Sequence, residues 1–220
     1  MKELRRIGAI GDVHCEDVVL ARAIETLRDA GSERIVCVGD IVDGLGDANR
    51  TCELLREHQI QCVAGNHERW FLTDKNRSIT GVTPKDALAQ EHQRWLASLP
   101  QTARLATPLG NLLVCHGVGE DDMAFLQPET RGYALQAIDV LRELMLDPEV
   151  DFMLGGHTHQ RMVRRFQGIT VVNAGTIHRN FEVGVILLDF EEERVRCFDW
   201  HDDRFQEGES ISLPRPAPLS

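Results

Sequence analysis

The chain has 220 residues, of which 42% are hydrophobic and 27% charged, so it is long enough for one domain with a full hydrophobic core. Its formal net charge of -11 repels phosphate backbones, which argues against extended nucleic-acid binding. No segment approaches the ~20 apolar residues of a membrane span, and the first apolar stretch is too short for a signal peptide. We therefore expect a cytoplasmic protein.

The first third of the chain alternates between strand and helix patterns. Residues 6–12, 34–40 and 60–67 are short apolar runs that predict strands, while residues 18–31 and 48–59 carry apolar side chains at helical spacing. Strand, helix, strand, helix, strand in this order is typical of a parallel sheet.

The middle of the chain is predicted to be mainly helical. Residues 85–100 and 131–147 have helical patterns, and residues 109–117 and 150–159 read as strands. Four further apolar runs then follow without helices between them, over residues 161–166, 168–175, 183–190 and 194–200. Their short connections favour antiparallel strands in a second sheet. We expect a single domain over residues 1–205 and a disordered, Pro-rich tail over residues 206–220.

The six cysteines do not suggest a metal or redox motif. None of them forms a CxxC pair, so neither a structural zinc site nor a thioredoxin-like motif is indicated. Cys37 and Cys115 lie inside apolar runs and are interpreted as reduced core residues.

Polar side chains that can bind metals or protons follow five of the predicted strands. They are Asp12, His14, Asp40, Asn66, His67, His116, His157 and His159. Ligands of open α/β sheets bind beyond the carboxyl ends of the strands, so these side chains are expected at one edge. Taken singly, each has an ordinary explanation, such as a helix cap, a turn residue or a core histidine. Those explanations account for one residue at a time, whereas a shared metal site accounts for all of them.

This mixture of donors favours two metal ions. Carboxylate, imidazole and amide oxygen together suit divalent transition metals, and an aspartate can bridge two of them. Two-metal hydrolases hold ions ~3.5–4 Å apart, where a bridging water becomes hydroxide near neutral pH. A protein nucleophile is not needed, and the sequence offers neither a Gly-x-Ser-x-Gly elbow nor a Cys–His pair for that role.

The ordered motifs resemble a known family. "GDVH", "GDIVD", "GNHE", "CHG" and "GGHTH", followed by "NAGTIH", are similar to the motifs of the calcineurin-like metallophosphoesterases, in particular the small bacterial and archaeal phosphodiesterase-like members. The match runs from about Asp12 to His159, with residues 173–178 similar to a segment that follows in the small members, and so covers most of the chain.

The resemblance implies an α/β fold of two facing mixed β-sheets flanked by helices, and a dinuclear centre of Mn²⁺, with Fe or Zn as alternatives. Asp12, His14 and His159 would hold one ion. Asn66, His116 and His157 would hold the other, and Asp40 would bridge them. His67 would then be the general acid for the leaving oxygen, oriented by Asp43.

Two departures from the family pattern bear on function. Cys15 replaces the glycine that usually follows Asp-x-His; we interpret it as a tolerated small residue rather than as an exposed thiol. Gly44 stands where phosphoprotein phosphatases carry a phosphate-gripping arginine, and this predicts a preference for diesters that Gly44→Arg should reduce. Arg69, Arg161 and Arg179 follow site motifs and are either substrate contacts or ordinary surface arginines.

Three functions are weighed on this basis. The first is hydrolysis of a small phosphodiester or nucleotide-like substrate through a metal-bridging hydroxide. The second is a phosphoprotein phosphatase of the same chemistry. The third is a non-catalytic protein-binding scaffold, like the retromer subunit that resembles this family. That subunit lacks the histidine of the Gly-Asn-His motif, whereas His67 is present here, which disfavours the scaffold.

Overall fold

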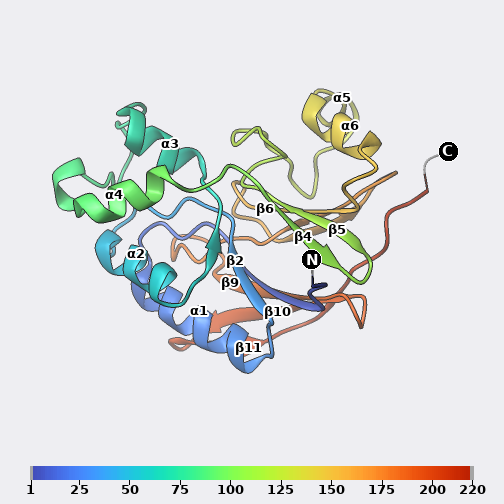
Figure 1. Cartoon of the computed structure of the whole chain (residues 1–220), viewed down its shortest axis with the longest axis horizontal. Coiled ribbons are helices and arrows are strands. Elements are labelled where there is room, and N and C mark those ends of the chain that lie inside the picture. Colours follow the sequence, from blue (N-terminus) through green and yellow to red (C-terminus); the bar gives the residue numbers. More distant parts are fainter. Residues whose placement is uncertain (1, 219–220) are drawn as a thin grey trace.

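The computed structural model describes residues 2–218, and it contains two β-sheets that face each other, with helices on their outer sides (Figure 1). This confirms the predicted fold class. The first sheet has seven strands, in the order β11-β10-β9-β1-β2-β3 with β12 also paired to β10. The second has five, in the order β4-β5-β6-β8-β7.

The strands of the first sheet come from both ends of the chain. They are β1 (Arg6–Ile10), β2 (Arg34–Cys37), β3 (Gln61–Cys62), β9 (Gly184–Asp189), β10 (Arg194–His201), β11 (Arg204–Glu207) and β12 (Ile211–Ser212). The second sheet comprises β4 (Ala103–Thr107), β5 (Gly110–Val114), β6 (Phe152–Gly155), β7 (Met162–Arg165) and β8 (Thr170–Asn173). Pairs β1/β2, β2/β3, β5/β6 and β6/β8 are parallel, and the other ladders are antiparallel.

The helices form the two outer layers (Figure 1). They are α1 (Asp17–Asp29), α2 (Ala48–Glu57), α3 (Asn66–Thr73), the 3₁₀ turn η1 (Lys85–Ala87), α4 (Gln90–Ala97), α5 (Gly132–Gln136) and α6 (Asp139–Leu146). Helices α1 and α2 share one hydrophobic cluster with the first sheet, whereas α6 packs on the second sheet in a separate cluster. A third cluster fills the space between the sheets.

Strand β9 illustrates why the sheets are covered on both faces. All six of its residues are buried. Val185 and Leu187 belong to the cluster under the helices, and Ile186 and Leu188 to the cluster between the sheets. Successive side chains of a strand point to opposite faces, so an uninterrupted apolar strand needs cover on both sides.

The same strand corrects the prediction for the second half of the chain. Strands β9 and β10 were expected in a second sheet, but they return to the first, where β9 pairs antiparallel with β1. Strand β8 is antiparallel to β7 but parallel to β6. An apolar pattern indicates that a strand is buried, but it does not say which partner covers it.

Other expected elements differ in extent, and the helix predicted over residues 85–100 is divided into η1 and α4. The strand predicted over residues 60–67 is only Gln61–Cys62, because the chain turns into α3 at Asn66. The helix predicted over residues 131–147 is broken between α5 and α6. The break lets Leu141 and Leu144 pack against the second sheet.

The expectation of a disordered tail is wrong for residues 206–218; residues 219–220 lie outside the described part. Strand β12 pairs with β10, and Leu213 is completely buried between the sheets. The backbone N–H of Ala217 donates to Phe166 at 3.0 Å. Prolines in this segment lack their own N–H, but their neighbours still form backbone hydrogen bonds. The apolar contact of Leu213 therefore outweighs a composition that is typical of disorder.

All six cysteines are free and buried, as the sequence indicated for Cys37 and Cys115. Among residues 2–218, none of the helices combines the length and apolar character that a membrane crossing requires.

Candidate metal centre

Loops at one edge of the two sheets bring the predicted ligands together. Asp12 and His14 follow β1, Asp40 follows β2, His116 follows β5, and His157 and His159 follow β6. The turns are sharp: φ is 46° at His14, 49° at Asp40, 66° at His157 and 58° at His159. Positive φ is uncommon for residues with a side chain and concentrates at functional sites, where the surrounding structure holds the strain.

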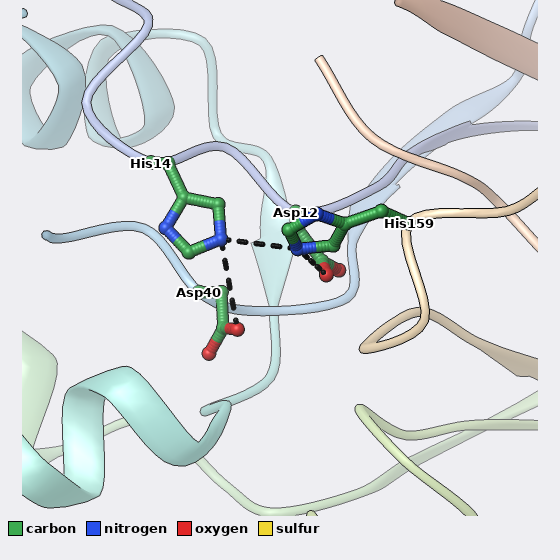
Figure 2. A group of neighbouring side chains, drawn as sticks. All are labelled: Asp12, His14, Asp40 and His159. Atoms are coloured by element: carbon green, nitrogen blue, oxygen red, sulfur yellow. Dashed lines mark hydrogen bonds and ion pairs between the residues drawn. The ribbon is translucent and has the colours of Figure 1, made fainter. Parts of the chain in front are cut away.

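The first group of donors is shown in Figure 2 and contains Asp12, His14, Asp40 and His159. Nε2 of His159 lies 2.9 Å from Oδ2 of Asp12 and 3.3 Å from Nε2 of His14. Nε2 of His14 is 3.9 Å from Oδ2 of Asp40. Atoms from three separate loops thus converge on one point.

The second group contains Asp40, His116 and His157. Nε2 of His116 lies 3.2 Å from Oδ2 of Asp40 and 3.0 Å from Oδ1 of Asn66. Asp40 is therefore common to both groups. The first group contains the histidines and carboxylates that the resemblance implies for one ion, and the second contains those implied for the other; Asn66, also implied for the second ion, contacts His116 there.

Hydrogen bonds behind the imidazoles determine which nitrogen faces the centre. Nδ1 of His14 lies 2.8 Å from the backbone oxygen of Asp43, and Nδ1 of His116 lies 2.8 Å from that of Val38. A carbonyl can only accept, so Nδ1 carries the proton in both rings and Nε2 is left as the inward donor atom. Backbone carbonyls commonly orient metal-binding histidines in this way.

The donor set fits divalent ions on several observations. Oδ2 of Asp12 is buried without a hydrogen-bond partner among the described residues, although it faces Nε2 of His159. Such an atom is costly unless a cation satisfies it. Burial lowers the pKa of both His14 and His157, which favours the neutral imidazole that metals bind.

The field around Asp40 also favours a positive charge. Burial alone would raise the pKa of Asp40, but His116, His67 and His14 together hold it below its usual range. Burial would lower the pKa of His116, yet the charge of Asp40 and a hydrogen bond to it raise that pKa to about 10. The Asp40 carboxylate thus favours a proton on His116, and it would favour a divalent cation at the same place for the same reason.

Glu68, which was not among the predicted site residues, holds the Asp40 loop through hydrogen bonds. It is completely buried, and its carboxylate accepts four backbone N–H groups, from Asp40 (2.9 Å), Ile41 (2.7 Å), Val42 (3.2 Å) and Gly65 (2.8 Å). Burial and the nearby charge of Asp40 raise its pKa. Its place in "GNHE", beside two residues that were assigned, was the available signal.

His67 lies at the edge of the centre rather than inside either donor group. Its Nδ1 is 2.9 Å from Oδ2 of Asp43, and its Nε2 is 3.9 Å from Oδ2 of Asp40. Arg77 holds both oxygens of Asp43, through Nη1 to Oδ2 at 2.8 Å and Nη2 to Oδ1 at 3.0 Å. Burial would lower the pKa of His67, but the Asp43 hydrogen bond and the charge of Asp40 raise it overall. Arg77 had no signal in the sequence, because it comes from a loop outside every motif.

The three arginines singled out in the sequence are each paired with a carboxylate. Arg69 makes a bidentate contact with Asp122, at 2.6 and 2.8 Å. Arg161 pairs with Asp199. Arg179 donates from its Nε to Glu16 at 2.6 Å. Arg77 on Asp43 forms a fourth such pair near the centre, whereas Nη1 of Arg161 is buried without a hydrogen-bond partner among the described residues.

The two departures from the family pattern have structural explanations. Cys15 has φ of 58°, a conformation that suits the glycine usually found there. Its thiol is buried, which raises its pKa to about 12; this agrees with a tolerated small residue and excludes an exposed thiol. A Cβ on Gly44 would lie 1.7 Å from the backbone oxygen of His14. Gly44→Arg would therefore displace the loop that carries His14, and it cannot serve as a clean test of substrate preference.

Two groups of convergent donors thus lie at the edge of a two-sheet α/β fold, and the comparisons with known proteins identify the family. The family model of the calcineurin-like phosphoesterase superfamily domain matches residues 6–193, so the chain belongs to that superfamily.

Two curated relatives align with only part of this chain. The chain is 29% identical over 101 residues to the uncharacterized protein MJ0912 of Methanocaldococcus jannaschii, an alignment that covers 43% of this chain and 42% of that protein. It is 35% identical over 72 residues to serine/threonine-protein phosphatase 1 of Salmonella typhimurium, covering 32% of this chain and 33% of the relative. Both alignments thus span less than half of each relative.

Among solved structures, hypothetical protein PH1004 from Pyrococcus horikoshii OT3 has a similar fold. The TM-score is 0.72 at 15% identity, and the match covers 91% of this chain and 88% of that one. At this identity the likeness supports the fold alone.

Proposed function

We propose that the protein is a dinuclear phosphoesterase that hydrolyses a small phosphodiester or nucleotide-like substrate. The observation that carries this proposal is the pair of donor groups that share Asp40. One ion would be held by Asp12, His14 and His159, and the other by Asn66, His116 and His157. Mn²⁺ suits this mixture of oxygen and nitrogen donors, with Fe or Zn as alternatives.

Such ions, when bound, neutralise the phosphoryl group and supply an activated water. The chain itself supplies the proton for the leaving oxygen. His67 is suited to this role because its Nε2 points toward Asp40 while Asp43 binds the opposite nitrogen. Burial would lower the pKa of His67, but the Asp43 hydrogen bond and the charge of Asp40 raise it, which favours the protonated imidazole that a general acid requires.

The preference for a diester is supported by the ion pairs around the centre. A phosphomonoester carries nearly two negative charges at pH 7, and the second charge benefits most from a bidentate guanidinium. Arg69, Arg77 and Arg179 are each bound to a carboxylate of the protein instead. Position 44, where protein phosphatases carry such an arginine, has no room for a side chain.

A phosphoprotein phosphatase is the second candidate, favoured by the partial match to phosphatase 1 of Salmonella typhimurium. The two proposals are separated by comparing kcat/KM for bis-p-nitrophenyl phosphate and p-nitrophenyl phosphate with Mn²⁺. Diester hydrolysis predicts a ratio above one. A strong preference for the monoester, together with release of phosphate from phosphopeptides, would favour the phosphatase.

A further inference from the structure

An aromatic side chain stands against one edge of the candidate centre. The ring of Phe181 is perpendicular to that of His159, with centroids 4.3 Å apart, and its centroid is 5.5 Å from that of His178. The side chain is nevertheless 50% exposed. An exposed phenyl ring beside a catalytic centre is apolar surface that a ligand can cover.

Phe181 lines two adjoining hollows of the surface. One, of about 820 Å³, begins at His159 and is also lined by Arg161 and Glu182. The other, of about 650 Å³, lies toward Trp200. These volumes are in the range of small-molecule sites, and the first opens directly beside the donor group of Figure 2.

The position of Phe181 relative to His67 distinguishes the two ends of a substrate. The His67 ring contacts those of His14 and Trp70, with centroids 4.8 Å away in both cases. The Phe181 ring instead contacts those of His159 and His178. A leaving group that takes its proton from His67 therefore lies beside a different set of rings. The substituent that remains on phosphorus is then the one available to Phe181.

The side chains that line the larger hollow indicate which kind of retained substituent it can bind. Four carboxylates line it, from Glu129, Glu182, Asp199 and Glu209. Its one arginine, Arg161, pairs with Asp199 through Nη2 and leaves Nη1 without a partner among the described residues, so one guanidinium faces four carboxylates. A substituent that carried a further phosphate would face uncompensated negative charge. A neutral aromatic or heterocyclic group meets no such repulsion and gains the face of Phe181.

We propose that Phe181 and the hollow beside His159 form the subsite for the retained substituent of a phosphodiester, and that this substituent is an uncharged aromatic or heterocyclic group. The inference rests on the proposed function and refines it from phosphodiester to a class of phosphodiester. Phe181 would thus determine specificity without taking part in proton transfer.

The test compares two diesters that differ only in the retained group. Bis-p-nitrophenyl phosphate and methyl p-nitrophenyl phosphate have the same charge and the same leaving group. Their intrinsic reactivities differ, but this difference cancels when the ratio of their kcat/KM values is compared between enzymes. Phe181→Ala should lower that ratio on the order of three- to tenfold, the size expected from one aromatic contact. Phe181→Tyr should keep it near the wild-type value.

A matched control is available on the outer surface. Tyr133 in α5 is an exposed aromatic, at 86%, and lines neither hollow. Tyr133→Ala should leave the ratio unchanged. An unchanged ratio in Phe181→Ala, or an equal fall in both variants, would overturn the subsite.

A binding measurement separates this inference from the proposed function. Calorimetric titration of the Mn²⁺-loaded protein with phenylphosphonate and methylphosphonate reports the subsite without turnover. The wild type should bind the phenyl compound more tightly, and Phe181→Ala should reduce that advantage by a similar factor. If the enzyme hydrolyses no diester, the proposed function fails, and this titration alone decides whether the aromatic subsite exists. Equal affinities for the two phosphonates in the wild type would contradict it.

Discussion

Nδ1 of His67 lies 2.9 Å from Oδ2 of Asp43, so the ring that we propose as general acid is oriented by a carboxylate with no exposed surface. That carboxylate is itself fixed by Arg77 and by the backbone N–H of Thr83 at 2.8 Å. Asp43 therefore binds His67 on the side away from the centre and is itself held by two groups, while Nε2 of His67 lies 3.9 Å from Oδ2 of Asp40.

This arrangement predicts that His67 acts on the leaving group and not on the metals. His67→Ala should leave metal content near normal but lower turnover by ~10²–10⁴, the usual contribution of a general acid. The loss should shrink for p-nitrophenolate, a leaving group that hardly needs a proton, and grow for an alkoxide. Asp43→Asn should show a milder form of the same pattern. Equal losses for good and poor leaving groups would remove His67 from this role.

Arg77 should matter for both stability and turnover. Arg77→Ala leaves the Asp43 carboxylate without its bidentate partner, so the free energy of unfolding should fall by ~1–3 kcal/mol. Turnover of substrates with poor leaving groups should fall as well, because Asp43 holds His67 less firmly. Urea denaturation and steady-state kinetics check the two effects. Arg50→Ala is the matched control, since Arg50 forms only surface pairs on α2 and its removal should change stability by less than ~0.5 kcal/mol.

Much of this centre could be predicted from the sequence because short apolar runs mark where the strands end. Asp12, Asp40 and His116 each follow a short apolar run, and the parallel arrangement of such runs places their ends at one edge. The local pattern therefore carried information about contacts between distant segments.

The supporting residues could not be predicted in the same way. Arg77 contacts Asp43 across 34 positions of sequence from a loop without a motif, and its partner is determined only by how that loop folds back. The placement of β9 and β12 in the first sheet likewise depends on which apolar faces remain to be covered. Neither property is encoded in a local pattern of apolar and polar residues.

Glu68 should be necessary for the Asp40 loop. In Glu68→Gln the amide group presents N–H donors to backbone N–H donors, so about two buried N–H groups lose their acceptor. Each such loss costs ~1–3 kcal/mol, and we expect the free energy of unfolding to fall by ~2–4 kcal/mol. Metal retention should also weaken, because the displaced loop carries Asp40. Denaturation in chelator isolates the first effect, and Glu53→Gln on the exposed face of α2 is the control. A fall no larger than that of Glu53→Gln would contradict this role.

The two donor groups predict a pattern of metal loss. His14 belongs to one group and His157 to the other, whereas Asp40 belongs to both. After reconstitution with excess Mn²⁺ and gel filtration, the wild type should retain about two ions per chain. His14→Ala and His157→Ala should each retain about one, and Asp40→Asn fewer than either. Elemental analysis gives the counts. One ion or none in the wild type would contradict a dinuclear centre.

The ion pair between Arg69 and Asp122 offers a direct test of the preference for diesters. The guanidinium is held on Asp122 by two hydrogen bonds, which are the main cause of its raised pKa, and Arg69 lies two residues after His67 on α3. Asp122→Ala should release it toward a bound substrate. The extra charge of a phosphomonoester gains more from a free guanidinium than the single charge of a diester does.

We therefore expect Asp122→Ala to lower the ratio of kcat/KM for bis-p-nitrophenyl phosphate over p-nitrophenyl phosphate. The double variant Asp122→Ala, Arg69→Ala lacks both charges and should return the ratio to near the wild-type value. This return is the decisive part of the experiment, because a general disturbance of the loop around Asp122 would persist in the double variant. If both variants lower the ratio equally, Arg69 is not the released group. If Asp122→Ala leaves the ratio unchanged, pairing of Arg69 does not set the preference, and the diester proposal loses one of the ion pairs that support it.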